Sequence, residues 1–306
     1  MNKLGVYIVC CKKDYYFAKI GIASIRYWNE TVPVYLLKDL SQGYFDTSLT
    51  EKMFNVHIAT ADYKNLYAYI KLQPYISGLR ERILLSDSDV VWLGDMAATL
   101  DKYTENIIVD GYSPELAEEE MNRWYFNTDR LYQYDALYRY PGFLFNSGFF
   151  ACDTSIFQKE DFRHIIDWKD NPEFRVKNVF LCEDQGIINY LFSKKIARNE
   201  ISFKSLPLQI WGHSEEAENY NLEDIKQKKD YPRVIHWFGR KIGLIGFFPG
   251  SRVLKFYENY YYSKLNYGSV RLALARLKRS LLNPHYFVYQ SIKRIFYFFN
   301  GRGNDV

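Results

Sequence analysis

Residues 82–91 read RILLSDSDVV, in which two aspartates separate two apolar runs. Side chains alternate along an extended chain, so Asp87 and Asp89 are predicted to project to the same side and to reach one divalent cation. Hard oxygen ligands suit Mg²⁺ or Mn²⁺, which keep open positions for substrate phosphates. An isolated Asp-x-Asp pair is also typical of a solvated acidic turn, so the metal site depends on the motifs that follow.

Segments on either side of this stretch alternate between strand and helix patterns. Strand patterns occur at residues 5–11, 32–37, 56–58, 82–85, 143–152 and 234–238, and helix patterns at 16–28, 68–79 and 183–192. This alternation predicts an α/β fold with a doubly wound, mostly parallel sheet that binds ligands at the carboxyl ends of its strands. Asp87 and Asp89 fall at that edge.

The composition is that of an ordinary globular chain. Of 306 residues, 48% are hydrophobic and 25% charged, which excludes wholesale disorder. The four cysteines form no Cys-x-x-Cys pair and are typical of small core residues in a reducing compartment. The apolar run at residues 4–11 is too short for a signal peptide or a membrane span. We therefore expect a cytoplasmic protein.

Residues 111–141 interrupt the α/β pattern with a cluster of aromatic side chains. These are Trp124, Tyr125, Phe126, Tyr132, Tyr134, Tyr138 and Tyr140. Aromatic faces suit carbohydrate stacking, so the segment is interpreted as an acceptor-binding insertion or lid. A purely structural pair of helices packed by their aromatic residues explains the pattern equally well.

Residues 251–306 are predicted to form a separate basic, aromatic-rich helical tail after a catalytic domain at residues 1–250. Within 270–282, Leu274, Leu277 and Leu281 fall on one stripe of a helix. Further along the chain, the cations Lys293 and Arg294 lie among aromatic residues. Such a helix is typical of one lying on an anionic membrane surface. Nucleic acid is the competing partner, but the large aliphatic and aromatic share favours lipid; a helical cap packed on the catalytic domain is the other alternative.

Three further motifs follow the acidic pair in a definite order. In Phe145–Phe149, Gly148 permits close backbone approach and Asn146 offers an amide to sugar hydroxyls. Residues 183–186, Glu-Asp-Gln-Gly, bring a carboxylate and an amide to a helix start, and residues 236–241, His-Trp-Phe-Gly-Arg-Lys, put an imidazole at a strand end. Each motif alone is weak, because turns, helix caps and buried histidines supply the same residues.

Taken in this order, the motifs resemble those of the retaining glycosyltransferases of family 8, the group that includes glycogenin and bacterial lipopolysaccharide galactosyltransferases. The resemblance runs from about Gly5 to Gly243 and implies the Rossmann-like GT-A fold. It implies that Asp87, Asp89 and His236 hold Mn²⁺, or Mg²⁺, against the diphosphate of a UDP-sugar. The imidazole favours Mn²⁺, the softer of the two ions.

The resemblance also implies a set of donor-binding residues. Lys71 and Lys241 would contact phosphates, and Tyr16 would stack on uracil. The catalytic pair would be Asp184, which orients sugar hydroxyls, and Gln185, which lies near the anomeric carbon. The donor-binding set is completed by Asn146, Ser147, Gly148 and Gly239. Two positions depart from the family pattern: the acidic pair after the first strand is Lys13-Asp14, and Lys241 stands one residue early.

The sequence therefore predicts a metal-dependent, retaining glycosyltransferase that moves a hexose from a UDP-sugar to a glycan or glycolipid, such as a lipopolysaccharide or capsule precursor. It would be a peripheral protein at the inner face of the cell membrane. Two alternatives are a nucleotidyltransferase of related fold and a non-catalytic scaffold that keeps the sugar-nucleotide fold. The first lacks the glycine-rich loop expected after its first strand, because residues 10–14 contain no glycine. The intact motif residues argue against the second.

Overall fold

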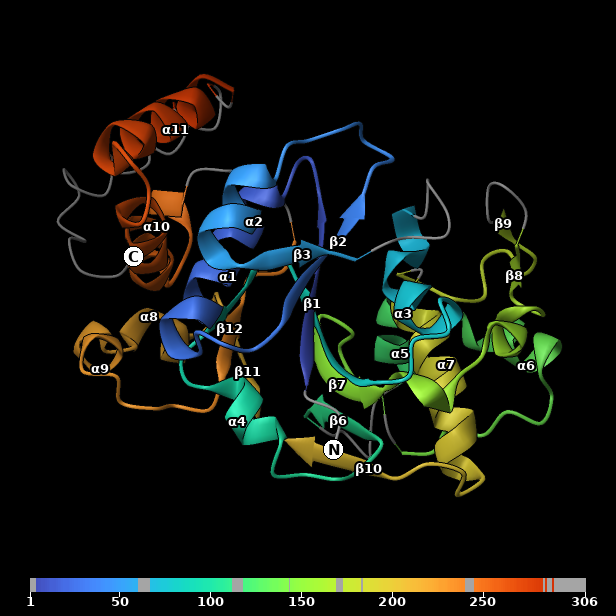
Figure 1. Ribbon diagram of the computed structural model, residues 1–306. Coiled ribbons are helices and arrows are strands. Elements are labelled where there is room, and N and C mark those ends of the chain that lie inside the picture. The colour runs from blue at the N-terminus through green and yellow to red at the C-terminus, as the bar shows by residue number, and fades with distance from the viewer. Residues whose placement is uncertain are drawn as a thin grey trace, which may run out of the picture.

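The computed structural model of the protein describes residues 4–59, 67–111, 118–142, 144–168, 173–182, 184–239 and 245–282, together with residues 284 and 288. A seven-stranded sheet forms its centre (Figure 1). In spatial order the strands are β10 (Phe203–Leu206), β6 (Ile107–Asp110), β7 (Phe149–Asp153), β4 (Arg82–Asp87), β1 (Gly5–Cys11), β2 (Val34–Asp39) and β3 (Val56–Ile58).

The sheet is mostly parallel, which confirms the predicted fold class. Strands β4, β1, β2 and β3 run parallel to one another, and β10 runs parallel to β6, whereas β7 is antiparallel to both β4 and β6. Strand β4 extends to Asp87. The acidic pair therefore lies at the carboxyl end of a strand inside the sheet, where folds of this class bind ligands.

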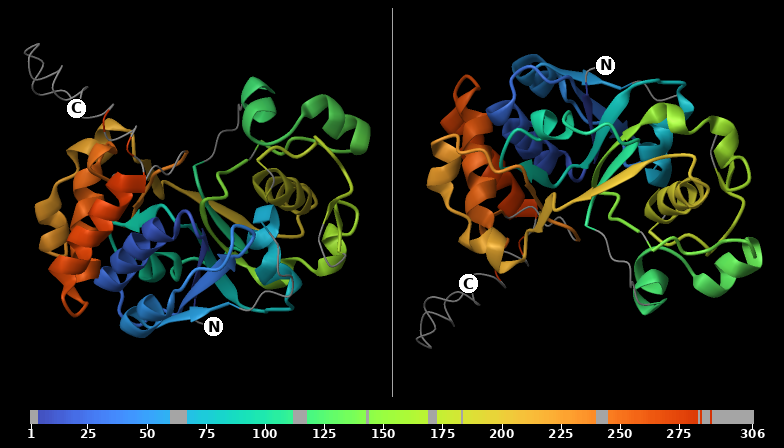
Figure 2. Two further views of the ribbon diagram at one scale, coloured as in Figure 1. Left: turned by 90° about the horizontal axis from the view of Figure 1, so that it is seen from above. Right: turned by 90° about the horizontal axis from the view of Figure 1, so that it is seen from below.

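Each face of the sheet is covered by its own hydrophobic core, as the alternation of side chains along a strand requires. On β4, Leu84 packs into the core shared with α1 (Tyr15–Trp28) and α10 (Ser251–Ser263). The neighbouring Leu85 packs into the opposite core with α7 (Asp184–Ala197). Figure 2 shows these helices on the two sides of the sheet. The doubly wound arrangement follows from this apolar alternation.

A second sheet has the order β11-β12-β5 and adjoins the acidic pair. Its strands are β11 (Gln209–Trp211), β12 (Val234–His236) and β5 (Val90–Trp92). Strand β12 is antiparallel to β5, with His236 opposite Val90, and parallel to β11. This pairing brings His236 beside the residue that follows Asp89. Strands β10 and β11 were absent from the sequence prediction.

The remaining helices are short. They are α2 (Ser48–Phe54), η1 (Tyr67–Leu72), α3 (Gln73–Ile76), α4 (Met96–Leu100), α5 (Glu118–Trp124), α6 (Thr128–Tyr134), η2 (Thr154–Ile156), η3 (Lys159–Phe162), α8 (Glu215–Asn219), α9 (Leu222–Lys226) and η4 (Ile245–Phe247); β8 (Ile166–Asp167) and β9 (Glu173–Phe174) form a small hairpin. The helix predicted at 68–79 is instead a 3₁₀ turn followed by one α-turn. Pro74 explains the break, because it cannot donate to the turn before it.

The aromatic segment at residues 111–141 contains α5 and α6. Asn122 joins the two helices, donating to Thr128 Oγ1 at 2.8 Å and accepting from the Thr128 amide at 2.9 Å. Phe126 and Tyr138 are buried in the core that α7 shares, whereas Trp124 is 40% exposed. Part of the aromatic content therefore serves packing. An acceptor-binding role for the segment stays a prediction.

Helix α10 lies within the range assigned to the tail, yet it packs in the same core as α1. Tyr257 and Tyr261 are buried there, and the Tyr257 hydroxyl donates to the Trp92 carbonyl at 2.7 Å. The packed core therefore extends into the range predicted for the tail. The predicted membrane association of residues 251–306 stays a prediction.

Helix α11 (Gly268–Leu282) packs Leu272 and Ala275 against the core that α10 shares, and it is joined to α10 by one buried carboxylate. Glu258 accepts hydrogen bonds from Arg276 at 2.6 Å and from Arg279 at 3.0 Å, and its side chain is 1% exposed. Helix α11 carries five exposed apolar side chains: Val270, Leu274, Leu277, Leu281 and Leu282. Within the described ranges, no helix combines the length and the apolar character needed to cross a membrane.

The four cysteines all lie within the described residues, where none of them forms a disulfide. Cys10 and Cys152 are buried, whereas Cys182 is exposed. Burial raises the pKa of the Cys152 thiol to about 12, so this side chain remains protonated at neutral pH. Cys152 therefore serves as a small core residue.

Candidate metal and donor site

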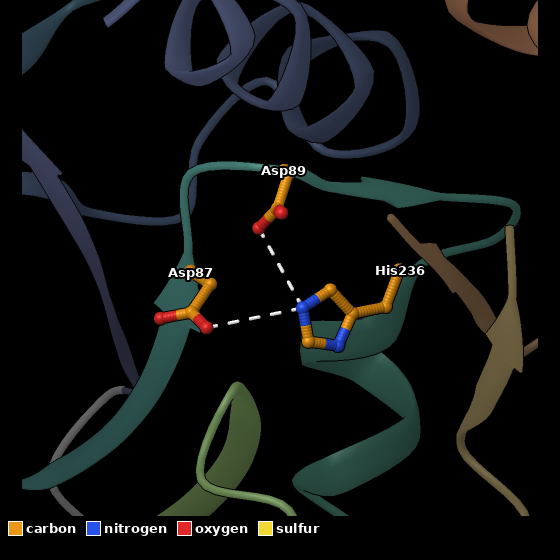
Figure 3. A group of neighbouring side chains, drawn as sticks. All are labelled: Asp87, Asp89 and His236. Carbon is orange, nitrogen blue, oxygen red and sulfur yellow. Dashed lines mark ion pairs between the residues drawn. The ribbon is translucent and has the colours of Figure 1, made fainter. Parts of the chain in front are cut away.

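Asp87, Asp89 and His236 converge at the carboxyl end of β4, and one ligand atom from each lies within 4.8 Å of the other two (Figure 3). Nε2 of His236 is 3.5 Å from Asp89 Oδ1 and 3.8 Å from Asp87 Oδ2. Asp89 and His236 are each 2% exposed. Two carboxylates gathered around an imidazole nitrogen in a buried position are typical of a divalent metal site.

The two aspartates approach each other for a reason different from the predicted one. Asp87 ends β4, and Ser88 and Asp89 form a turn before β5 begins at Val90. The convergence therefore comes from a turn between two strands that belong to different sheets, not from alternation along one strand. Two backbone bonds hold the turn: the Asp87 amide donates to the Gly148 carbonyl at 2.8 Å, and the Trp237 amide donates to the Asp89 carbonyl at 3.1 Å.

Gly148 is required beside this cluster because a side chain there would occupy the space of the ligands. A Cβ at this position would overlap His236 Cε1 and would lie 2.9 Å from Asp87 Oδ2. The sequence predicts glycine here for close backbone approach. In the structure, the groups approached include the side chains of His236 and Asp87.

Gly148→Ala is expected to reduce Mn²⁺ affinity roughly a hundredfold, because the added methyl group would displace the His236 ring and the Asp87 carboxylate from their present positions. Electron paramagnetic resonance of free Mn²⁺ during a titration measures this directly. Gly246→Ala is the matched control, since its Cβ would approach only the end of the Lys255 side chain, at 3.6 Å. Wild-type affinity in Gly148→Ala would contradict the assigned ligand geometry.

Lys71 joins the acidic cluster to the start of α7. Its ammonium is 2.9 Å from Asp87 Oδ1 and 2.9 Å from Asp184 Oδ2, and it donates to the Ser147 hydroxyl at 3.3 Å. Burial alone lowers the pKa of Lys71, but the carboxylates of Asp184 and Asp87 outweigh burial and raise it above its ordinary value. Lys71 is therefore a fixed cation between the two acids.

Asp184 shares this cation but lies in a more complex environment. Burial raises the pKa of its carboxyl, Lys71 lowers it, and the nearby charge of Asp87 raises it again, so that the net shift is upward. The Ser147 hydroxyl donates to Asp184 Oδ2 at 3.2 Å. Asp87 and Asp184 thus depend on the same ammonium, which connects the candidate metal site to the predicted sugar-binding residues.

Gln185 organises the loop that contains Asn146 and Ser147. Its Oε1 accepts from Asn146 Nδ2 and from the Ser147 amide, each at 3.2 Å, and its Nε2 donates to the Trp124 carbonyl at 3.0 Å. Asn146 Oδ1 in turn accepts from the Gly148 amide at 2.8 Å. The structure therefore brings together six of the residues predicted to bind the donor or to act in catalysis: Lys71, Asn146, Ser147, Gly148, Asp184 and Gln185.

Tyr16 has different neighbours from the six residues gathered around the start of α7. The guanidinium carbon of Arg279 on α11 lies 3.1 Å from the centre of its ring, and Lys19 Nζ lies 5.3 Å from it. The uracil-stacking role of Tyr16 therefore stays a prediction, and the ring in this structure is a cation–π partner of α11. Gly239 is exposed in a left-handed conformation with φ of 99°, and Lys241 lies outside the described residues.

Two supporting residues carried no signal in the sequence. Asn189 on α7 holds the Phe145 backbone through both of its hydrogen-bonding ends, at 2.8 and 2.9 Å. Gln209 on β11 faces the second ring nitrogen of His236. Neither belongs to a motif, and only the meeting of distant segments identifies them.

The donor set suits a divalent cation that binds both oxygen and nitrogen. Two carboxylates supply hard oxygen ligands, and the imidazole shifts the preference from Mg²⁺ towards Mn²⁺. The absence of a side chain at Gly148 leaves room beside His236, Asn146 and Asp87 that a Cβ would fill. Asp87, Asp89 and His236 therefore fit a bound metal ion.

Comparison with known proteins agrees with this geometry. The sequence profile of Glycosyl transferase family 8 matches residues 12–241. Among solved structures, the chain is similar to the bifunctional glycosyltransferase WbbM in its apo form, with a TM-score of 0.53 and 15% identity, covering 85% of this chain and 50% of that one. It is also similar to the galactosyltransferase LgtC in complex with donor and acceptor sugar analogues, with a TM-score of 0.50 and 14% identity, covering 85% of this chain and 95% of that one.

A third similar structure is the apo form of the glycosyltransferase GlyE from Streptococcus pneumoniae TIGR4, with a TM-score of 0.50 and 16% identity over 91% of this chain. The chain spans 50% of the WbbM chain and 64% of the GlyE chain. A search of curated protein sequences gives no match. At these identities the likeness shows a shared α/β fold with a mostly parallel central sheet.

Proposed function

The chain belongs to glycosyl transferase family 8, and on that premise we propose that it is a metal-dependent, retaining hexosyltransferase that uses a UDP-sugar as donor. The acceptor would be a glycan or glycolipid, such as a lipopolysaccharide or capsule precursor. The observation that carries the proposal is the unbroken series of contacts from His236 through Asp87 and Lys71 to Asp184. It connects a site suited to a diphosphate-bound metal with a site suited to sugar hydroxyls.

In this proposal Asp87, Asp89 and His236 hold Mn²⁺. The bound ion would supply neutralisation of the negative charge that develops on the departing diphosphate. Lys71 adds a second positive charge at the same place, and its two carboxylate partners fix its position before the donor binds. Preorganisation of this kind stabilises a transition state, because the cation does not have to be reoriented during the reaction.

The sugar would lie against the loop at residues 146–148 and the start of α7. Asp184 is placed to accept hydrogen bonds from sugar hydroxyls, and Gln185 would lie near the anomeric carbon. Retention by double displacement requires a carboxylate nucleophile. Asp184 is already paired with Lys71, which weakens it as a nucleophile. We therefore favour departure and attack on the same face, with the leaving phosphate accepting the proton of the acceptor hydroxyl.

A panel of nucleotide sugars, incubated with and without Mn²⁺, tests the donor and the metal together. We expect metal-dependent release of UDP from one UDP-hexose, with an α-configured sugar product detected by NMR. The nucleotidyltransferase alternative predicts no release of UDP; instead, added pyrophosphate would convert the UDP-sugar to UTP and a sugar 1-phosphate. Failure to bind or hydrolyse any UDP-sugar would contradict the proposal and would favour the scaffold alternative.

We also propose that α11 brings the enzyme to an anionic membrane surface. Val270, Leu274, Leu277 and Leu281 share one exposed face, and Leu282, Arg271 and Lys278 are exposed beside it on the same helix. An amphipathic helix of this kind inserts its apolar side chains among the acyl chains and keeps its cations at the headgroups. Two further cations of the tail, Lys293 and Arg294, lie outside the described residues.

Leu274, Leu277 and Leu281 are to be replaced together by serine. The partition coefficient onto phosphatidylglycerol vesicles, measured by sedimentation, is expected to fall about tenfold for each leucine replaced, because each replacement removes more than about 1.4 kcal/mol of apolar burial in the membrane. These substitutions are preferable to truncation after Glu258, which would also remove Tyr261 and Tyr262 from the core. Leu137→Ser is the control, since Leu137 is 85% exposed on a different part of the molecule. Unchanged sedimentation of the triple variant would exclude α11 as the anchor.

A further inference from the structure

The side chain of Gln209 meets the ring nitrogen of His236 that faces away from the aspartates. Gln209 Oε1 lies 2.8 Å from His236 Nδ1, while Nε2 of the same ring lies 3.5 Å from Asp89 Oδ1. Both residues are almost fully buried, at 5% and 2% exposure. Water therefore does not compete for this hydrogen bond, and its direction matters for the state of the ring.

A neutral imidazole has one nitrogen that donates and one that accepts, and only the nitrogen with a free lone pair can bind a metal ion. An amide oxygen can only accept a hydrogen bond. With Gln209 Oε1 at Nδ1, the hydrogen of the ring is placed on Nδ1. The lone pair is then left on Nε2, which faces Asp87 and Asp89.

The backbone of Gln209 is held at both its amide and its carbonyl. Its amide donates to Asp110 Oδ1 at 2.7 Å, and its carbonyl accepts from Arg233 Nη2 at 2.7 Å. Gln209 pairs with Val234 in the parallel ladder of β11 and β12, two residues before His236. These contacts fix the backbone of Gln209 and therefore the point from which its side chain reaches His236.

The ring of His236 is also restrained on one face. Trp211, two residues after Gln209 on the same strand, has its ring centre 5.4 Å from that of His236, with 32° between the planes. This packing limits rotation of the imidazole about its χ2 angle, while Gln209 selects which nitrogen carries the hydrogen. One short strand therefore fixes both the orientation and the tautomer.

We infer that Gln209 is a positioning residue for the metal site: its side-chain carbonyl holds His236 in the Nδ1–H tautomer and keeps Nε2 available to a divalent cation beside Asp87 and Asp89. The inference rests on the proposed metal dependence but concerns a residue outside the family motifs. Hydrogen-bond acceptors behind a metal-binding histidine typically change metal affinity 10–100-fold when they are removed, because the free ring distributes between tautomers and orientations.

The first test uses the metal-free wild-type protein with ¹⁵N-labelled histidine at pH 8. The chemical shifts of the two ring nitrogens of His236 identify which one is protonated, with His236→Asn providing the assignment. We expect the hydrogen on Nδ1. A ring protonated on Nε2 would overturn the inference, and this result does not require any variant of Gln209 to fold.

The second test compares two substitutions by titration with Mn²⁺ alone. Gln209→Met keeps the size of the side chain but removes the acceptor, and it is expected to weaken Mn²⁺ binding about 10–100-fold. Gln209→Glu keeps an acceptor oxygen and is expected to restore most of that affinity. Gln227→Met, on the exposed C-terminal end of α9, is the control for the substitution itself.

The two tests separate this inference from the proposed function. Wild-type Mn²⁺ affinity in Gln209→Met would overturn the positioning role even if the enzyme transfers sugar. Conversely, an absence of UDP-sugar turnover would contradict the proposed function, while the tautomer and the Mn²⁺ titrations would still decide the role of Gln209. A merely structural role for Gln209 predicts that the Met and Glu variants lose Mn²⁺ affinity equally.

Discussion

Asp89→Asn is expected to lower metal-dependent sugar transfer roughly a thousandfold, because removal of one preorganised charged group from a buried site costs two to three orders of magnitude in turnover. Asparagine preserves the size of the side chain and one oxygen, so the loss reports the charge. Asp89 is the stronger choice of the two aspartates because it is 2% exposed, whereas the side chain of Asp87 is 26% exposed and is also bound to Lys71.

Three measurements on Asp89→Asn identify the cause of the loss. Mn²⁺ affinity should fall with turnover, thermal stability without metal should remain close to that of the wild type, and UDP-sugar binding without metal should be unchanged. Asp101→Asn is the control, since Asp101 is an exposed carboxylate at the end of α4. Full activity in Asp89→Asn would mean that the acidic cluster is not a catalytic metal site.

Lys71→Met is expected to lower turnover about a hundredfold and to destabilise the metal-free protein by about 3 kcal/mol. Both effects have the same origin: the two partly buried carboxylates of Asp87 and Asp184 lose the cation that lies 2.9 Å from each. Mn²⁺ should restore part of the stability of this variant, because a cation bound to Asp87 reduces the repulsion between the two acids.

Lys71→Arg separates charge from shape at this position. An arginine keeps the positive charge and is expected to preserve most of the stability and turnover, although its planar donors match two carboxylates differently. Thermal denaturation with and without Mn²⁺ and steady-state kinetics measure the two effects. If Lys71→Met were as stable and active as the wild type, the ion pairs of Lys71 would have no part in holding the site.

Local sequence patterns were sufficient for the class of fold and for much of the element order. Strand β1 was predicted with its observed bounds, because a short run of apolar and β-branched residues is typical of a buried parallel strand. The helix predicted at 68–79 was wrong in kind, since Pro74 limits it to two short turns. The strand predicted at 143–152 begins only at Phe149, because residues 145–148 form the loop beside Asp87 and His236.

The sequence by itself determined which chemical groups are available at the site: the acidic pair, the histidine at a strand end, the loop glycine and the acid–amide pair at a helix start. These could be read from the chain because each depends on a few neighbouring residues. The turn that brings Asp87 and Asp89 together could not, because it joins strands of two different sheets.

Only the tertiary structure decided how these groups act together. It placed Lys71 between Asp87 and Asp184, it put Gln209 behind His236, and it packed α10 into the core beside α1. Each contact joins segments separated by many residues, and each depends on the register of strands or on the packing of helices across a sheet. No short stretch of sequence contains that information, because it arises from the simultaneous burial of all the apolar faces in one folded molecule.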